Sequence, residues 1–171
     1  PNSGVQYPSA KFADVNIISG TATDPTSSIP DGGVYIQVYY TAAAINYYWD
    51  PTIPGFSDTP SAYWYQATGS ANWSYNPALF VNYTGWVDAR SYIFKSTCTD
   101  QANNPEVTED TDNRKTYMCD KVKPQSNTTS PSDTQSRVYN LSTIAGTSYD
   151  ASGVQRIEMR LKDDTDNIYW N

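Results

Sequence analysis

Apolar and polar residues alternate along several short segments of the chain, which is the period of a half-buried β-strand. The alternation is clearest in residues 34–39, 92–98 and 156–161. The apolar faces are formed by Val34, Ile36 and Val38, by Tyr92, Phe94 and Cys98, and by Ile157, Met159 and Leu161. Apolar residues do not recur at helical spacing. Short strands without helical crossovers predict an all-β fold, an antiparallel β-sandwich.

The chain also repeats part of itself. Residues 17–24 read Ile-Ile-Ser-Gly-Thr-Ala-Thr-Asp, and residues 143–150 read Thr-Ile-Ala-Gly-Thr-Ser-Tyr-Asp. An alternating strand follows each copy and precedes an aromatic dipeptide, Tyr48-Trp49-Asp50 in the first copy and Tyr169-Trp170-Asn171 in the second. The period of about 123 residues has the size of a domain. We therefore expect a complete module over residues 1–123, a linker over 124–135, and the first strands of a second module over 136–171.

Composition restricts the binding partners. The formal net charge is −7 and the pI is about 4.3. Affinity for nucleic acid and for anionic membranes comes largely from Lys and Arg, so neither partner is expected. No apolar run approaches the roughly 20 residues that span a bilayer, so membrane insertion is not expected.

The sequence offers no catalytic constellation. It contains no His, which excludes a Ser-His-Asp triad, a Cys-His pair and an imidazole metal site. We expect no enzymatic activity, no cofactor and no metal. If Ca²⁺ did bind, it would use oxygen-rich turns near the module junction, where Asp100 and Asp120 are the candidate ligands.

Three motifs follow one another in the second half of the first module. They are Asp88-Ala89-Arg90-Ser91-Tyr92, Asp100-Gln101-Ala102-Asn103-Asn104-Pro105-Glu106 and Asp120-Lys121-Val122-Lys123-Pro124. Together with the repeated Gly-Thr motif, they resemble the bacterial immunoglobulin-like repeats of large secreted surface and fibre proteins. Ala89 and Asn103 stand where that family usually has Gly. The resemblance implies an immunoglobulin-like sandwich in an extracellular, secreted or cell-surface protein.

This reading makes the chain a structural repeat module of an extracellular fibre, filament or adhesin. Its expected partners are other copies of itself, neighbouring repeats, or glycans on a surface. Asn-x-Ser/Thr sequons make Asn72, Asn82, Asn127 and Asn140 candidate glycosylation sites.

The aromatic residues allow two interpretations. Trp49, Trp64, Trp73 and Trp86 could stack on sugar rings or could fill the interior of the sandwich. The repeat of the Tyr-Trp dipeptide favours a structural role at Trp49. Trp64 and Trp73 lie in a less regular segment, and they define the alternative function, a carbohydrate-binding module of a secreted enzyme. Tyr92, which opens a strand, fits a tyrosine corner.

The two cysteines fall on the inward phase of their strands. Cys98 precedes a predicted turn, and Cys119 lies on the closing strand. Adjacent antiparallel strands can bring two such residues within bonding distance, so a Cys98–Cys119 disulfide is expected. The alternative is two separate buried thiols.

The second copy contains too few strands to bury its own apolar face. Ile144, Ile157, Met159 and Leu161 form that face. Two or three strands are marginal alone and leave unpaired edges. We expect the face to be covered by further strands of the same polypeptide, or by another copy as in strand-complemented filaments.

Overall fold

The computed structural model of the chain describes residues 1–107, 112–132 and 140–170. The chain divides into two compact units, Pro1–Lys121 and Val122–Asn171. The two units are described separately.

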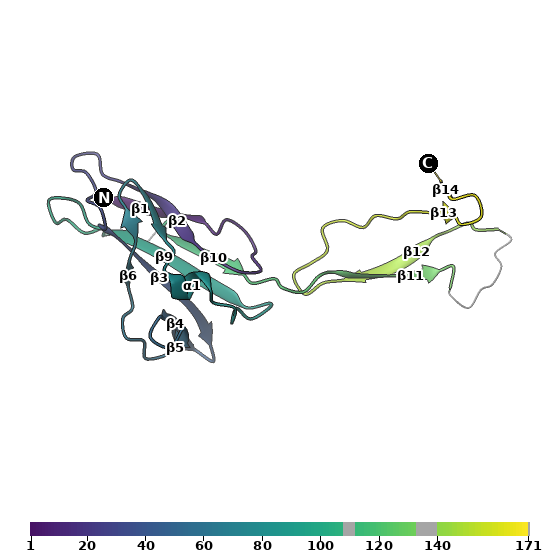
Figure 1. The fold of residues 1–171 in the computed structure, drawn as a ribbon, viewed down its shortest axis with the longest axis horizontal. Coiled ribbons are helices and arrows are strands. Elements are labelled where there is room, and N and C mark those ends of the chain that lie inside the picture. The colour runs from purple at the N-terminus through teal and green to yellow at the C-terminus, as the bar shows by residue number, and fades with distance from the viewer. Residues whose placement is uncertain (108–111, 133–139, 171) are drawn as a thin grey trace. The chain divides into compact units, whose positions relative to one another are not determined.

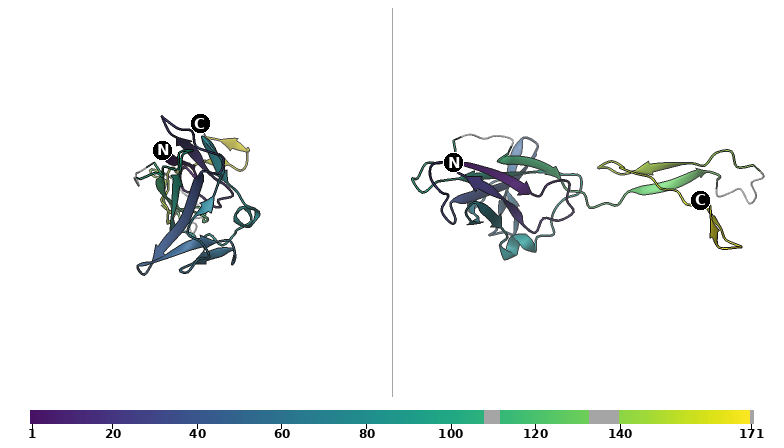
Figure 2. Two further views of the ribbon diagram at one scale, coloured as in Figure 1. Left: turned by 90° about the vertical axis from the view of Figure 1, so that its left-hand side faces the viewer. Right: turned by 90° about the horizontal axis from the view of Figure 1, so that it is seen from above.

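The first unit contains two antiparallel sheets (Figure 1). One has the strand order β1 (Asn2–Tyr7), β2 (Ile18–Thr23), β8 (Asn72–Tyr75), β7 (Thr68–Gly69). The other has the order β10 (Arg114–Met118), β9 (Ser91–Cys98), β3 (Val34–Ala42), β4 (Ile45–Asp50), β5 (Gly55–Ser57), and β6 (Tyr65–Gln66) pairs with the first half of β3. The right-hand view of Figure 2 shows β1 and β2, the purple strands near the N-terminus, side by side.

The order of the strands is that of an immunoglobulin-like sandwich. In a constant-type domain, strands A, B, E and D form one sheet, and strands C, F and G form the other. Here β1, β2, β3, β7, β8, β9 and β10 take the places of A to G. In addition, β4 and β6 pair with β3, and β5 pairs with β4. Side chains from both sheets form one core cluster. The predicted all-β antiparallel sandwich is confirmed.

The prediction of almost no helix is also confirmed. The described residues contain one helix, α1 (Ala78–Val81), which places Phe80 in the core. It is far too short to span a bilayer, and no described segment forms a helix that could do so.

Strand alternation decides which side chains enter the core. On β9, Tyr92, Phe94, Ser96 and Cys98 are buried and the residues between them are half-buried, as the pattern predicted. On β3 the inward residues Val34, Ile36 and Val38 are almost completely buried. The outward-facing Gln37 and Tyr39 are buried as well, which alternation alone does not predict.

Aromatic rings fill the end of the sandwich near α1. The ring of Trp49 meets Phe80 edge-on with 5.1 Å between centroids, and Trp86 meets Tyr92 edge-on at 4.9 Å. Such edge-to-face pairs stabilise beyond the area they bury. The next residue, Asp50, is also buried; its carboxylate accepts hydrogen bonds from Thr52 and Ser61.

The hydrogen bond from the Thr52 hydroxyl is the main cause that lowers the pKa of Asp50 to about 2. Because the pKa is lowered, the ionised carboxylate stabilises the folded state at pH values above the ordinary pKa of an Asp side chain. This contribution is lost as the pH falls towards 2.

Several non-glycine residues occupy the left-handed backbone region. Ala43 and Ala44 form the two-residue turn between β3 and β4 with φ of 49° and 64°. Ala89 and Asn103 have φ of 59° and 63°. The latter two stand where the family that the sequence resembles usually has Gly, the residue that adopts this conformation without steric cost.

The second unit begins with a hairpin that reproduces β1 and β2. Strand β11 (Gln125–Ser130) pairs with β12 (Ala145–Tyr149), and its register shifts between Thr128 and Ser130 as that of β1 shifts between Val5 and Tyr7. A cis X-Pro bond follows each strand, at Tyr7-Pro8 and Ser130-Pro131. Residues 125–130 therefore form a paired strand, and the expected linker over 124–135 is wrong at these positions. Residues 133–139, which include the expected start of the second module, lie outside the described ranges.

The repeated motif has the same local structure in both units. Asp24 accepts hydrogen bonds from the amides of Thr26 and Ser27, and Asp150 accepts one from the amide of Ser152. Such side-chain turns are typical of Asp. At Gly20 and Gly146 the paired strand passes so close that an added Cβ would lie 1.8 and 2.5 Å from a carbonyl oxygen of that strand. Both positions therefore require Gly.

The last hairpin of the second unit differs from its counterpart in register. Strand β13 (Lys162–Asp163) pairs with β14 (Ile168–Tyr169) around a turn over residues 164–167. Asp163 corresponds to Ala42 in the first unit, which pairs with Ile45 around the two-residue turn. The pairing in the second unit is thus shifted by two residues.

Candidate interaction surfaces

Trp64 and Trp73 do not form a common ligand platform. Trp73 lies on β8, is only 2% exposed, and belongs to the core between the sheets. Trp64 precedes β6 in the other sheet and is 37% exposed. The prediction of a joint platform is wrong, because Trp73 shares the inward phase of β8 with Tyr75.

Trp64 instead belongs to an aromatic patch outside the second sheet. The Lys95 ammonium lies 5.9 Å from the centre of the Trp64 ring. Lys95 pairs with Gln37 across β9 and β3, and Tyr39 pairs with Tyr48 across β3 and β4. The ring of Tyr63 packs edge-on against Tyr48. These neighbours account for the burial of Gln37 and Tyr39 on the outward face of β3.

The predicted disulfide is wrong, because Cys98 and Cys119 are free and buried. The register of β9 with β10 explains this. Met118 pairs with Ser91, and Cys119 exchanges backbone hydrogen bonds with Ala89 and Arg90, at the opposite end of β9 from Cys98. Eight residues of strand at ~3.3 Å each separate the two ends by about 26 Å, far beyond disulfide reach.

Burial suppresses the reactivity of both thiols. It is the main cause that raises the pKa of Cys98 to about 12 and that of Cys119 to about 11, and the nearby Glu106 carboxylate contributes to the raised pKa of Cys98. Since the thiolate is the reactive form, we expect no alkylation of the folded protein near pH 8. After denaturation without reductant, mass spectrometry should find both cysteines alkylated. A denatured protein that takes up alkylating agent only after reduction would contradict the structure.

Glu106 joins three segments of the first unit, a role that the sequence analysis did not identify. Its carboxylate accepts hydrogen bonds from the amide of Ser3 at 2.8 Å and the hydroxyl of Ser3 at 2.6 Å, on β1. It also accepts from the amide of Cys98 on β9 at 3.1 Å and from the side-chain amide of Asn113 at 3.1 Å. Ser3 and Asn113 are buried. Glu106 ties β1 to the β9–β10 hairpin, which is a structural function.

The two candidate Ca²⁺ ligands do not meet. Asp100 is buried, and its carboxylate accepts hydrogen bonds from the amides of Ala102 and Asn104 and from the Asn104 side chain. These bonds, led by the Asn104 side chain, lower its pKa. Asp120 follows Cys119 and therefore lies at the other end of β9 and β10. No cluster of three or more potential metal ligands occurs among the described residues.

Tyr92 forms the predicted tyrosine corner. Its hydroxyl accepts a hydrogen bond of 3.0 Å from the amide of Val87, five residues upstream. The ring is fully buried, and burial raises the pKa of the hydroxyl. The corner fixes the chain where it enters β9, so Tyr92 has a structural role.

The candidate glycosylation sites all lie at the surface. Asn72 on β8, Asn82 after α1, Asn127 on β11 and Asn140 are exposed. The side chain of Asn82 donates to the carbonyl of Ala78.

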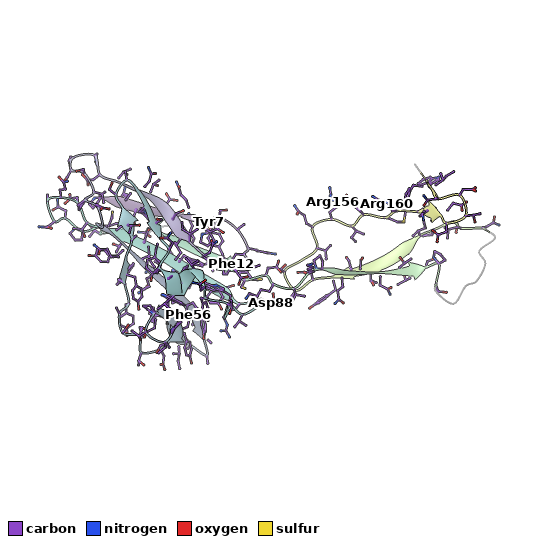
Figure 3. The ribbon with its side chains drawn as sticks, viewed as in Figure 1. Tyr7, Phe12, Phe56, Asp88, Arg156 and Arg160 are labelled. Atoms are coloured by element: carbon purple, nitrogen blue, oxygen red, sulfur yellow. The ribbon has the colours of Figure 1, made fainter. Side chains whose placement is uncertain are left out.

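The largest difference between the two units is the exposure of their corresponding apolar residues. Ile36 and Val38 are 0% and 1% exposed, whereas Ile157 and Met159 are 65% and 60% exposed. Trp49 is 0% exposed and its counterpart Trp170 is 76% exposed. Figure 3 locates this segment by Arg156 and Arg160, which alternate with the apolar residues along the chain. The second unit thus exposes to solvent the residues whose counterparts form the core of the first unit.

Comparison with known proteins assigns no family to the chain, since no family model, curated protein or solved structure matches it.

Proposed function

We propose that the chain is a non-enzymatic structural repeat segment of an extracellular fibre or adhesin, which associates through β-strand or module contacts. The observation that carries the proposal is the hairpin β11–β12. It repeats β1–β2 in pairing, in the position of the register shift and in the close approach at Gly146. A chain that builds the same structural unit twice is typical of tandem arrays.

The exposed face of the second unit supports association as the activity. Contiguous exposed apolar side chains usually mark interaction surfaces. Ile157, Met159, Leu161, Ile168 and Trp170 are all exposed within one short stretch. Of the corresponding residues in the first unit, Ile36, Val38 and Trp49 are buried in the core, and Tyr40 packs against it.

The alternative, a carbohydrate-binding module, loses half of its proposed site because Trp73 is buried. Trp64 and Tyr63 still present exposed rings, which could stack on a sugar. The outward position of Trp64 is the one observation that favours this second candidate.

Sedimentation velocity of the whole chain over a range of concentrations tests the proposal against the alternative. We expect concentration-dependent self-association that Trp64→Ala leaves unchanged, and no retention on a panel of insoluble polysaccharides. A chain that stays monomeric and is retained on a polysaccharide, with retention lost in Trp64→Ala, would replace the proposed function with carbohydrate binding.

A further inference from the structure

The segment over residues 154–160 has the sequence of a core strand but pairs with no other strand in the part of the chain that the structure describes. Its counterpart is β3, which lies between β9 on one side and β4 and β6 on the other. Ile157 and Met159 correspond to Ile36 and Val38, whose side chains pack in one core with Phe94 and Cys98 of β9. The second unit therefore has a β3-like sequence that forms no strand, and it lacks a β9-like partner among its described residues.

A groove lies where that partner would place its inward side chains. It has a volume of about 280 Å³, and its lining includes Ile144, Gly146, Ile157, Glu158 and Met159. Ile144 corresponds to Ile18, which is 1% exposed in the first unit. The equivalent space in the first unit is part of the core cluster that contains Ile18, Ile36, Val38 and Phe94.

The charges along this unpaired segment specify the partner further. In the first unit Gln37 lies opposite Lys95, Tyr35 opposite Thr97, and Tyr39 opposite Ile93. The corresponding residues of the second unit are Glu158, Arg156 and Arg160. A strand in the register of β9 would place its Lys opposite Glu158. Opposite charges in such cross-strand pairs stabilise a sheet.

We propose that residues 155–161 form an acceptor for an extended strand of the β9 type, which pairs antiparallel to them in the register that β9 adopts on β3. Apolar residues of this strand alternate into the groove, and a basic residue faces Glu158. The inference rests on the proposed repeat function and specifies the partner of one surface. The β9 of a second copy is not this strand, because its residues Tyr92 and Phe94 are completely buried in their own sandwich.

A synthetic peptide with the sequence of residues 88–100, Cys98 replaced by Ser, provides the test on the whole chain. We expect it to slow amide hydrogen exchange of residues 155–161 by roughly tenfold or more, because new ladder hydrogen bonds protect these amides. The control peptide has the same composition with its apolar and polar positions exchanged, which turns the apolar side chains away from the groove. It should give no protection.

Two substitutions test the register. Glu158→Lys should weaken peptide binding about two- to fivefold, and a peptide with Glu in place of its Lys should restore it. Met159→Thr changes an exposed side chain, so the chain should fold normally while binding weakens. Met159→Thr with unchanged affinity would overturn the inference.

The remaining outcomes are equally decisive. Equal protection by both peptides, or by neither, would overturn the inference and leave self-association in sedimentation as the separate test of the proposed function. Protection of residues 155–161 without peptide, in a dimer that excess peptide does not dissociate, would identify a second copy as the occupant and also overturn it. Peptide binding by a chain that never self-associates would support the inference while contradicting association between copies.

Discussion

Replacement of Trp49 with Ala is expected to lower the free energy of unfolding by about 3–5 kcal/mol, the range for loss of a buried aromatic side chain. Trp49 is completely buried and contacts the rings of Phe56, Phe80 and Tyr83. Its removal deletes these contacts and leaves a cavity. Urea denaturation followed by near-ultraviolet circular dichroism measures the effect, and Trp49→Phe, which keeps a ring in the site, should cost less.

The internal repeat supplies a matched control. Trp170 occupies the same place in the Tyr-Trp motif but is 76% exposed. Trp170→Ala should therefore change the free energy of unfolding by less than about 0.5 kcal/mol, as for other exposed positions. A loss as large as that of Trp49→Ala would show that Trp170 is buried in solution.

Replacement of Glu106 with Ala should destabilise the first unit by about 3 kcal/mol, because it removes the charged acceptor of buried donors on two strands, Ser3 on β1 and Cys98 on β9. Glu106→Gln should have an intermediate effect. The amide retains the shape and one acceptor oxygen, but its NH₂ group cannot accept from the backbone N–H of Cys98. Equilibrium denaturation of both variants gives the comparison.

Glu158→Ala serves as the control for Glu106. Glu158 is exposed and pairs with Arg156 at 2.9 Å. Surface ion pairs of this kind contribute only about 0–1 kcal/mol. If Glu106→Ala is no more destabilising than Glu158→Ala, then the hydrogen bonds to Glu106 do not hold β1 to the β9–β10 hairpin.

The sequence predicted those features that depend on side-chain period or on one local motif. The alternation in β9 correctly placed Tyr92, Phe94 and Cys98 inside, and the position of Tyr92 at the start of a strand correctly predicted the tyrosine corner. Trp73 could have been assigned to the core by the same rule, since Trp73 and Tyr75 alternate with Asn72 and Ser74.

Features that depend on strand register could not be predicted. Cys98 and Cys119 are both inward-facing, yet the pairing of Met118 with Ser91 places them at opposite ends of two strands. Alternation gives the face of a residue and contains no information on its position along the neighbouring strand. The role of Glu106 was missed for the same reason, because its partner Ser3 is 103 residues away in sequence.

The shifted pairing of β13 with β14 has a consequence for how such repeats can vary. A shift of two residues returns every side chain to the same side of the sheet, because strand side chains alternate with a period of two. The turn over residues 164–167 is therefore two residues longer than that of the first unit, at the expense of paired residues and without any inserted residue, while the apolar residues keep their side. By the same rule, an insertion of two residues in this hairpin would leave the apolar side chains on the same side of the sheet. A single inserted residue would turn the strand over or require a bulge.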